Sequence, residues 1–163
     1  MIVFDYVASM TSAARTLVTF KNSSFNTTDD REYFINPCNY GEDVAFWIAD
    51  GLEQFGATVS RKREFPAQED FGWFVNFRIA NQSYCLVVGA RSEDENDYEW
   101  VVWLERDCGI LATLLGGRRR HIEQDAVELV HRVITSSPTT ADIRWYNWKD
   151  YDSGKEDLAS DRP

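Results

Sequence analysis

The stretch EDFGWFVNFRIANQSYCLVVGARSEDENDYEWVVWLE, from Glu69 to Glu105, decides the fold of this chain. It contains three runs rich in aromatic and β-branched residues, Gly72–Ala80, Ser83–Arg91 and Tyr98–Arg106, separated by turn-forming residues. Such runs at short spacing are typical of an antiparallel β-meander. The sequence therefore predicts three consecutive antiparallel strands at the centre of the protein.

The pattern within these runs predicts which side chains face the core. Odd positions from Trp73 to Ile79 are apolar, and alternation along a strand places them on one face. The second run contains the nearly continuous apolar segment Tyr84–Val88, which predicts a central, covered strand. Cys85 lies inside that segment and is expected in the core.

An amphipathic helix is predicted over Gly41–Phe55. Its apolar residues recur at spacings of three and four, namely Val44, Trp47, Ile48, Leu52 and Phe55. Asn39 is a candidate N-cap, and Gly56 is placed to end the helix. Gly51, inside the helix, costs up to about 1 kcal/mol relative to Ala, which suggests close packing against the sheet.

The remaining segments extend this plan. A second amphipathic helix is predicted over Ile122–Thr135, and further strands are predicted over Arg15–Phe20, Glu32–Ile35, Ala57–Phe65 and Ala141–Trp148. The expected fold class is α+β, with two amphipathic helices packed on a mostly antiparallel sheet.

The length of 163 residues fits one domain over residues 1–150. Residues 1–36 are expected as an N-terminal arm or as edge strands, and the charged residues 151–163 as a flexible tail.

Charge and composition exclude several classes of function. The net charge is −10, which argues against direct nucleic-acid binding, because phosphate contacts need a surplus of Lys and Arg. Two interpretations of the charge stay open: simple solubility, or a negative surface that docks on a basic protein. No apolar run is long enough to cross a bilayer, and the first residues lack the basic region of a signal peptide.

The cysteine pattern points to a reducing compartment. Cys38, Cys85 and Cys108 lack paired spacing, which predicts reduced thiols in a cytoplasmic protein and no zinc site. His121 and His131 are too far apart for ligands on adjacent turns of a helix. No nucleophile motif is present, so no catalytic residue, metal or cofactor is predicted.

The first candidate site is the acidic loop Ser92–Asp97. It is either a solvated hairpin tip or a contact surface for a basic groove on a partner, with an adjacent tyrosine as an aromatic anchor. The order of its carboxylates does not fit an EF-hand calcium loop. The residues of this candidate are Glu93, Asp94, Glu95, Asp97 and Tyr98.

The aromatic residues of the last predicted strand are the second candidate. Trp145 falls on one face, while Tyr146 and Trp148 share the other. If one face is core, the other is either an interface with a partner or a second copy of this chain, or it is covered by a helix or the N-terminal arm.

A basic cluster before the second helix is the third candidate. It follows two glycines and consists of Arg118, Arg119, Arg120 and His121. Such a cluster at a helix start could bind an anion, but the favoured interpretation is a solvated loop or arginines that pair with acidic residues elsewhere. Together with Glu69, Asp70 and Trp73 it would form a small-ligand site or an enzyme site.

The segments CNYGEDVAFWIADGLEQFGATVS, EDFGWFVNF, YCLVVG and WVVWLE resemble small bacterial proteins in which an acidic helix start and an E-D-[FW]-G-W element precede a β-meander. The resemblance covers Cys38–Glu105 and implies a shared α+β fold without a catalytic set. In size, charge and fold class the chain is also similar to toxin-immunity proteins and to phage-encoded inhibitors such as anti-CRISPR proteins. The expectation is a non-enzymatic protein that blocks or sequesters a macromolecular partner with a basic surface; a small-ligand protein or enzyme and a structural homo-oligomer subunit are the alternatives.

Overall fold

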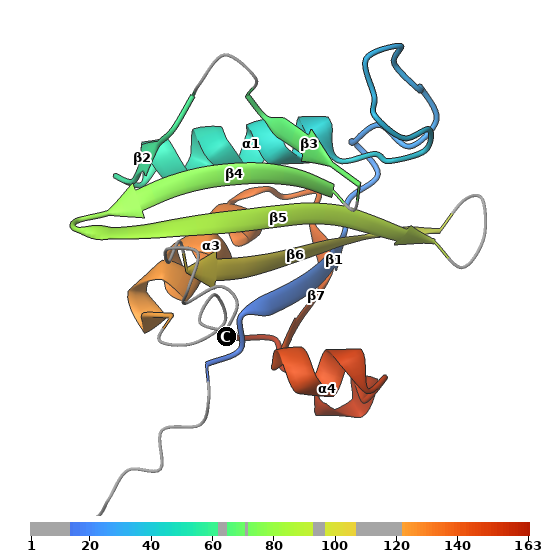
Figure 1. Cartoon of the computed structure of the whole chain (residues 1–163). Helices are drawn as coiled ribbons and strands as arrows, with labels where there is room; N and C mark the ends of the chain where they lie inside the picture. Colours follow the sequence, from blue (N-terminus) through green and yellow to red (C-terminus); the bar gives the residue numbers. More distant parts are fainter. Residues whose placement is uncertain (1–13, 62–64, 71, 93–96, 107–121) are drawn as a thin grey trace, which may run out of the picture.

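A seven-stranded antiparallel sheet forms the centre of the protein (Figure 1). The computed structural model describes residues 14–61, 65–70, 72–92, 97–106 and 122–163. Its strands are β1 (Leu17–Lys21), β2 (Thr58–Val59), β3 (Ala67–Glu69), β4 (Gly72–Ile79), β5 (Gln82–Ser92), β6 (Tyr98–Arg106) and β7 (Ala141–Tyr146). Its helices are α1 (Glu42–Gln54), α3 (Gln124–Ser136), α4 (Trp148–Asp152) and the 3₁₀ helix η2 (Glu156–Leu158). The α+β prediction is confirmed.

The strand order is β2-β4-β5-β6-β1-β7, and β3 also pairs with β4. The predicted meander is therefore confirmed as β4, β5 and β6, with β5 paired on both sides. β1 lies inside the sheet, because it pairs with β6 on one side and β7 on the other. It is an interior strand, whereas the sequence predicts an arm or edge strands for residues 1–36.

Both predicted amphipathic helices form, and α1 and α3 pack on the same face of the sheet. Trp73, Val75 and Phe77 of β4 are buried beneath them, as the alternation predicts. The glycine within α1 faces α3 and not the sheet, which corrects the predicted contact. A Cβ on Gly51 would lie 2.6 Å from Cγ1 of Val133, so the absent side chain sets the approach of the two helices.

The ends of α1 show one confirmed and one wrong prediction. Gly56 ends the helix: its N–H bonds to the carbonyl of Glu53, and the next N–H reaches Leu52 across 2.9 Å. Asn39 is not the N-cap. That position is Gly41, and the Asn39 side chain donates to the carbonyl of Glu69 at 3.2 Å.

Two predicted strands are shorter or absent. Glu32–Ile35 forms no strand, and it leaves Tyr33 and Ile35 exposed. Within Ala57–Phe65 only Thr58–Val59 is a strand among the described residues, and a further short strand, β3, follows Pro66.

The C-terminal segment returns to the sheet. α4 packs Trp148 and Tyr151 on the face opposite α1 and α3, against a buried cluster of Leu17, Val101 and Tyr146. Ser160 then exchanges two backbone hydrogen bonds with Trp145, at 2.6 and 3.0 Å. Regular structure thus continues into residues 151–163, where the sequence predicts a flexible tail. None of the described helices is long and apolar enough to cross a membrane.

Candidate functional site

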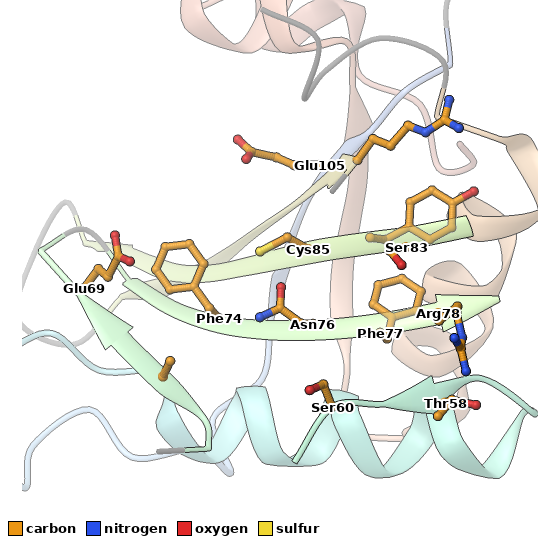
Figure 2. A pocket seen from close by; sticks show the side chains of 13 residues that line it. Thr58, Ser60, Glu69, Phe74, Asn76, Phe77, Arg78, Ser83, Cys85 and Glu105 are labelled. Atoms are coloured by element: carbon orange, nitrogen blue, oxygen red, sulfur yellow. The ribbon is translucent and has the colours of Figure 1, made fainter. Parts of the chain in front are cut away.

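The face of the sheet opposite α1 and α3 carries a cleft of about 710 Å³ (Figure 2). It lies over β2 to β6, while α4 covers the same face nearer β7. Its lining residues are Thr58, Ser60, Ala67, Glu69, Phe74, Asn76, Phe77, Arg78, Ser83, Tyr84, Cys85, Glu105 and Arg106. We call this feature the sheet cleft.

Strand register builds the floor of the sheet cleft. Asn76 pairs with Cys85, and Cys85 with Glu105, so three polar side chains form one row across β4, β5 and β6. The next row toward the β4–β5 hairpin holds Arg78 and Ser83. Cys85 is half-buried in the cleft floor, which corrects its predicted place in the core.

Charge is distributed unevenly along the sheet cleft. Figure 2 shows Glu69 and Phe74 toward one end, Glu105 midway above Cys85, and Arg78 at the other end. Arg106 belongs to the Arg78 end, because its guanidinium donates to the side chain of Gln82 at the start of β5. The cleft therefore has an acidic end with an aromatic ring and a basic end near the hairpin.

The local environment decides what these groups can do. Glu105 is 9% exposed, and Trp103 Nε1 donates to its Oε1 at 3.2 Å. Burial, reinforced by the charge of Glu123, raises the pKa of Tyr84, so this phenol is neutral at physiological pH. Among the described residues that line the cleft there is no histidine. Within the described ranges no group of His, Cys, Asp and Glu could hold a metal ion. The arrangement can bind polar and charged groups.

The predicted acidic site is only partly within the described residues. Glu93, Asp94 and Glu95 lie outside them. Asp97 is exposed and forms an ion pair with Lys21 at 2.5 Å. Tyr98 is half-buried against Tyr40, with ring centroids 5.9 Å apart. The docking role of this loop stays a prediction.

The aromatic candidates of β7 are covered on both faces of the sheet. Trp145 and Tyr146 are each 1% exposed, so neither is available for the surface contacts predicted for it. Trp145 donates from Nε1 to Nδ1 of His131 at 3.1 Å, while α4 covers Tyr146. Trp148 starts α4, where it is half-buried against Trp103 at 5.7 Å between ring centroids.

The predicted small-ligand site divides into separate regions. Arg118, Arg119, Arg120 and His121 lie outside the described residues. Glu69 lines the sheet cleft, whereas the buried Trp73 lines a second cavity of about 370 Å³ together with Tyr33 and Ile35. Asp70 is exposed and lines neither cavity. Glu69 and Trp73 therefore do not converge on one pocket.

Sequence reasoning missed Phe74, Asn76, Cys85 and Glu105 as site residues. A signal was present on β4, where an aromatic, an amide and a guanidinium occupy successive positions that face away from the core. Such a series on an interior strand indicates a face that is neither a dry core nor an ordinary charged surface.

Neither family models nor curated protein sequences nor solved structures match this chain.

Proposed function

We propose that this protein is a non-catalytic binding protein, whose sheet cleft takes up a segment of a macromolecular partner with a basic surface. The observation that carries the proposal is the cleft itself, an opening of about 710 Å³ on one face of a sheet whose other face is packed by two helices. A paired sheet holds its side chains in fixed register, which suits recognition more than rearrangement.

The chemistry of the lining supports binding without catalysis. Aromatic and arginine side chains are enriched in protein interfaces, and here Phe74, Arg78 and Arg106 stand beside hydrogen-bonding groups such as Asn76. The net charge of −10 would attract a basic partner and accelerate its association. The same charge disfavours nucleic acid as the direct ligand.

In this proposal the protein acts by occupying its partner, as inhibitors and immunity proteins of the anti-CRISPR or antitoxin kind do, in the cytoplasm and without a cofactor. An oligomer through β7 is not part of the proposal. Ser160 pairs with Trp145 on the outer side of that strand, and a second copy would have to displace it.

The test uses purified protein as bait in bacterial lysate at low and at high salt, with retained proteins identified by mass spectrometry. Asn76→Arg places a long charged side chain in the cleft at an exposed position of β4. Asp157→Lys is the matched control, because it reverses an exposed charge on η2 outside the cleft. A stoichiometric partner that wild type and Asp157→Lys retain at low salt, and that Asn76→Arg loses, supports the proposal.

Equal retention by folded Asn76→Arg would overturn the role of the sheet cleft. Circular dichroism and thermal denaturation establish that the variant is folded.

A small-ligand protein is the second candidate, because a cleft of about 710 Å³ lies within the range of ligand sites, roughly 300–1,000 Å³. A thermal-shift screen of metabolites checks it. Stabilisation of the wild type and not of Asn76→Arg, without any protein partner, would favour this candidate over the first.

A further inference from the structure

We infer that the pocket between β3 and the start of α1 is a second protein-binding surface, which takes one large apolar side chain from a basic segment of a partner. This is the cavity of about 370 Å³ whose lining residues are Tyr33, Ile35, Glu42, Phe65, Pro66, Ala67, Gln68 and Trp73. We call it the β3 pocket. Of these residues only Ala67 also lines the sheet cleft, so the inference goes beyond the role proposed for that cleft.

Exposed apolar side chains gather around the β3 pocket. The large apolar residues that are exposed in the described part of the chain are Tyr33, Ile35, Phe46 and Leu158. Tyr33 and Ile35, each 58% exposed, line the pocket. Phe46 extends the patch along α1, because its ring lies 5.5 Å from that of the pocket-lining Phe65. Single exposed apolar residues are ordinary, whereas a contiguous patch beside a cavity indicates a binding surface.

Hydrogen bonds hold the exposed residues in place. The backbone N–H of Ile35 donates to Oε1 of Gln68 on β3 at 2.8 Å, and the Tyr33 hydroxyl donates to the carboxylate of Glu42 at 2.8 Å. Figure 1 shows the loop that carries them, residues 22–41, beside the end of β3. The apolar parts of Tyr33 and Ile35 therefore face solvent in a fixed arrangement, which lowers the entropic cost of binding.

The lining suits an apolar anchor. Trp73 and Pro66 are buried and Phe65 is half-buried, so rings and aliphatic groups form much of the wall. The indole N–H of Trp73 donates to the carbonyl of Asn39 at 2.9 Å, and the pocket is thus left with the ring. A leucine, methionine or phenylalanine side chain matches such a lining, as buried anchors do in other protein interfaces.

Charge at the rim favours a basic partner. Glu32 is next to the pocket-lining tyrosine, and the Asn36 side chain donates to the backbone carbonyl of Asp70 at 3.3 Å, which brings Asp70 beside the same loop. Among the described residues no ion pair involves Glu32 or Asp70, whereas Arg31 is already paired with Glu42 at 3.1 Å. The net charge of −10, which counts every residue, has the same sign. Lys or Arg beside the apolar anchor would complement this rim.

The test is a ¹⁵N–¹H NMR titration of the full chain with the peptide acetyl-Lys-Lys-Leu-Lys-Lys-amide. The comparison peptides carry alanine in place of leucine, or glutamate in place of every lysine. We expect saturable shifts at Tyr33, Ile35 and Gln68 with a Kd on the order of millimolar for the first peptide, weakened by salt. The alanine peptide should bind at least about tenfold more weakly, and the glutamate peptide should not bind.

Two variants separate the apolar and the charged contributions. Ile35→Ser removes apolar surface but keeps the backbone N–H, and it should raise the Kd of the leucine peptide roughly three- to tenfold. Leu158→Ser is the matched control, because it makes the same kind of change at an exposed position on η2 outside the pocket, and it should leave the Kd unchanged. Asp70→Lys should raise the Kd roughly two- to fivefold, and Asp157→Lys should not.

Equal affinity for the leucine and alanine peptides, equal binding of the glutamate peptide, or an unchanged Kd in Ile35→Ser would overturn the inference. Shifts of the same signals with protein concentration alone would assign the patch to a second copy of this chain and would also overturn it. The ¹⁵N–¹H spectrum of each variant shows whether it is folded. Asn76→Arg should leave the peptide Kd unchanged, so a loss of partner capture in that variant concerns the sheet cleft and not the β3 pocket.

Discussion

Substituting alanine for Gly51 tests whether the contact between α1 and α3 is as close as the structure indicates. In an exposed helix the change would stabilise the protein by about 1 kcal/mol, because Ala is the better helix former. Here the new Cβ would lie 2.6 Å from Cγ1 of Val133, closer than carbon atoms tolerate, and 3.1 Å from Cγ2, which is also a tight contact. Val133 is fully buried and β-branched, so it cannot rotate away at low cost.

The expected net effect is a loss of stability. Overpacking a core costs typically about 1–3 kcal/mol. Subtracting the helix-propensity gain leaves Gly51→Ala destabilised by about 0–2 kcal/mol. Val133→Ala alone removes two methyl groups, and transfer plus the cavity left behind should cost about 2–3 kcal/mol. The double variant should be no less stable than Val133→Ala, because the methyl group introduced at position 51 enters the space that the valine side chain leaves.

Urea denaturation followed by tryptophan fluorescence gives the free energy of unfolding of the wild type, of each single variant and of the double variant. The two substitutions should be coupled by about 1–3 kcal/mol in the favourable direction. Additive effects, or a Gly51→Ala variant stabilised by the full helix-propensity gain, would refute the close approach of the two helices.

Three further predictions concern the rest of the fold. Burial lowers the pKa of His131, whose Nδ1 accepts a hydrogen bond from the Trp145 N–H. As the pH falls, the unfolded chain therefore binds a proton at His131 before the folded protein does. The free energy of unfolding should be greatest above about pH 6.5 and should decrease as the pH drops through that value. Urea midpoints measured on either side of this pH check it, and an equal slope in His131→Asn would contradict it. Ala80, in the β4–β5 loop, has a φ of +48°, a left-handed conformation that costs about 1–2 kcal/mol for a residue with a Cβ. Ala80→Gly removes this strain, but the greater backbone entropy of unfolded glycine offsets part of the gain, so thermal denaturation should show about 0.5 kcal/mol of added stability. An unchanged or lower stability would count against this. Arg91 forms an ion pair with Glu156 at 3.1 Å, and its guanidinium lies over the Tyr151 ring. Arg91→Ala should therefore make the segment after β7 more sensitive to limited proteolysis. An unaltered cleavage rate would show that other contacts keep this segment on the sheet.

Local patterns predicted much of the fold. Alternation along Trp73–Ile79 and helical spacing in Gly41–Phe55 and Ile122–Thr135 are each decided within a few residues, and the structure confirms all three. Cys85 shows where such patterns stop. Because its neighbours Tyr84 and Leu86 are both apolar, the run alone does not say which face is the core, and only pairing with β4 and β6 decides it.

The candidate site was less predictable, since it depends on contacts between distant segments. Asn76 and Glu105 meet through β5, which neither residue's own sequence neighbourhood reveals. Similarly, Tyr146 looked like a surface aromatic because α4, which covers it, lies in a polar stretch with a weak helical pattern. Position on a face can be predicted from sequence, whereas what covers that face often cannot.

The place of β1 has a consequence for how the molecule is made. Leu17 pairs with Trp103 and with Tyr146, so β1 can complete its pairing on both edges only after the much later strands β6 and β7 have been synthesised. During translation α1 and the β4–β6 meander can associate before β7 exists, while β1 still exposes backbone groups and apolar side chains to water. Until β7 has been synthesised, one edge of β1 therefore has no strand to pair with, and an unpaired strand edge is a site at which chains can aggregate.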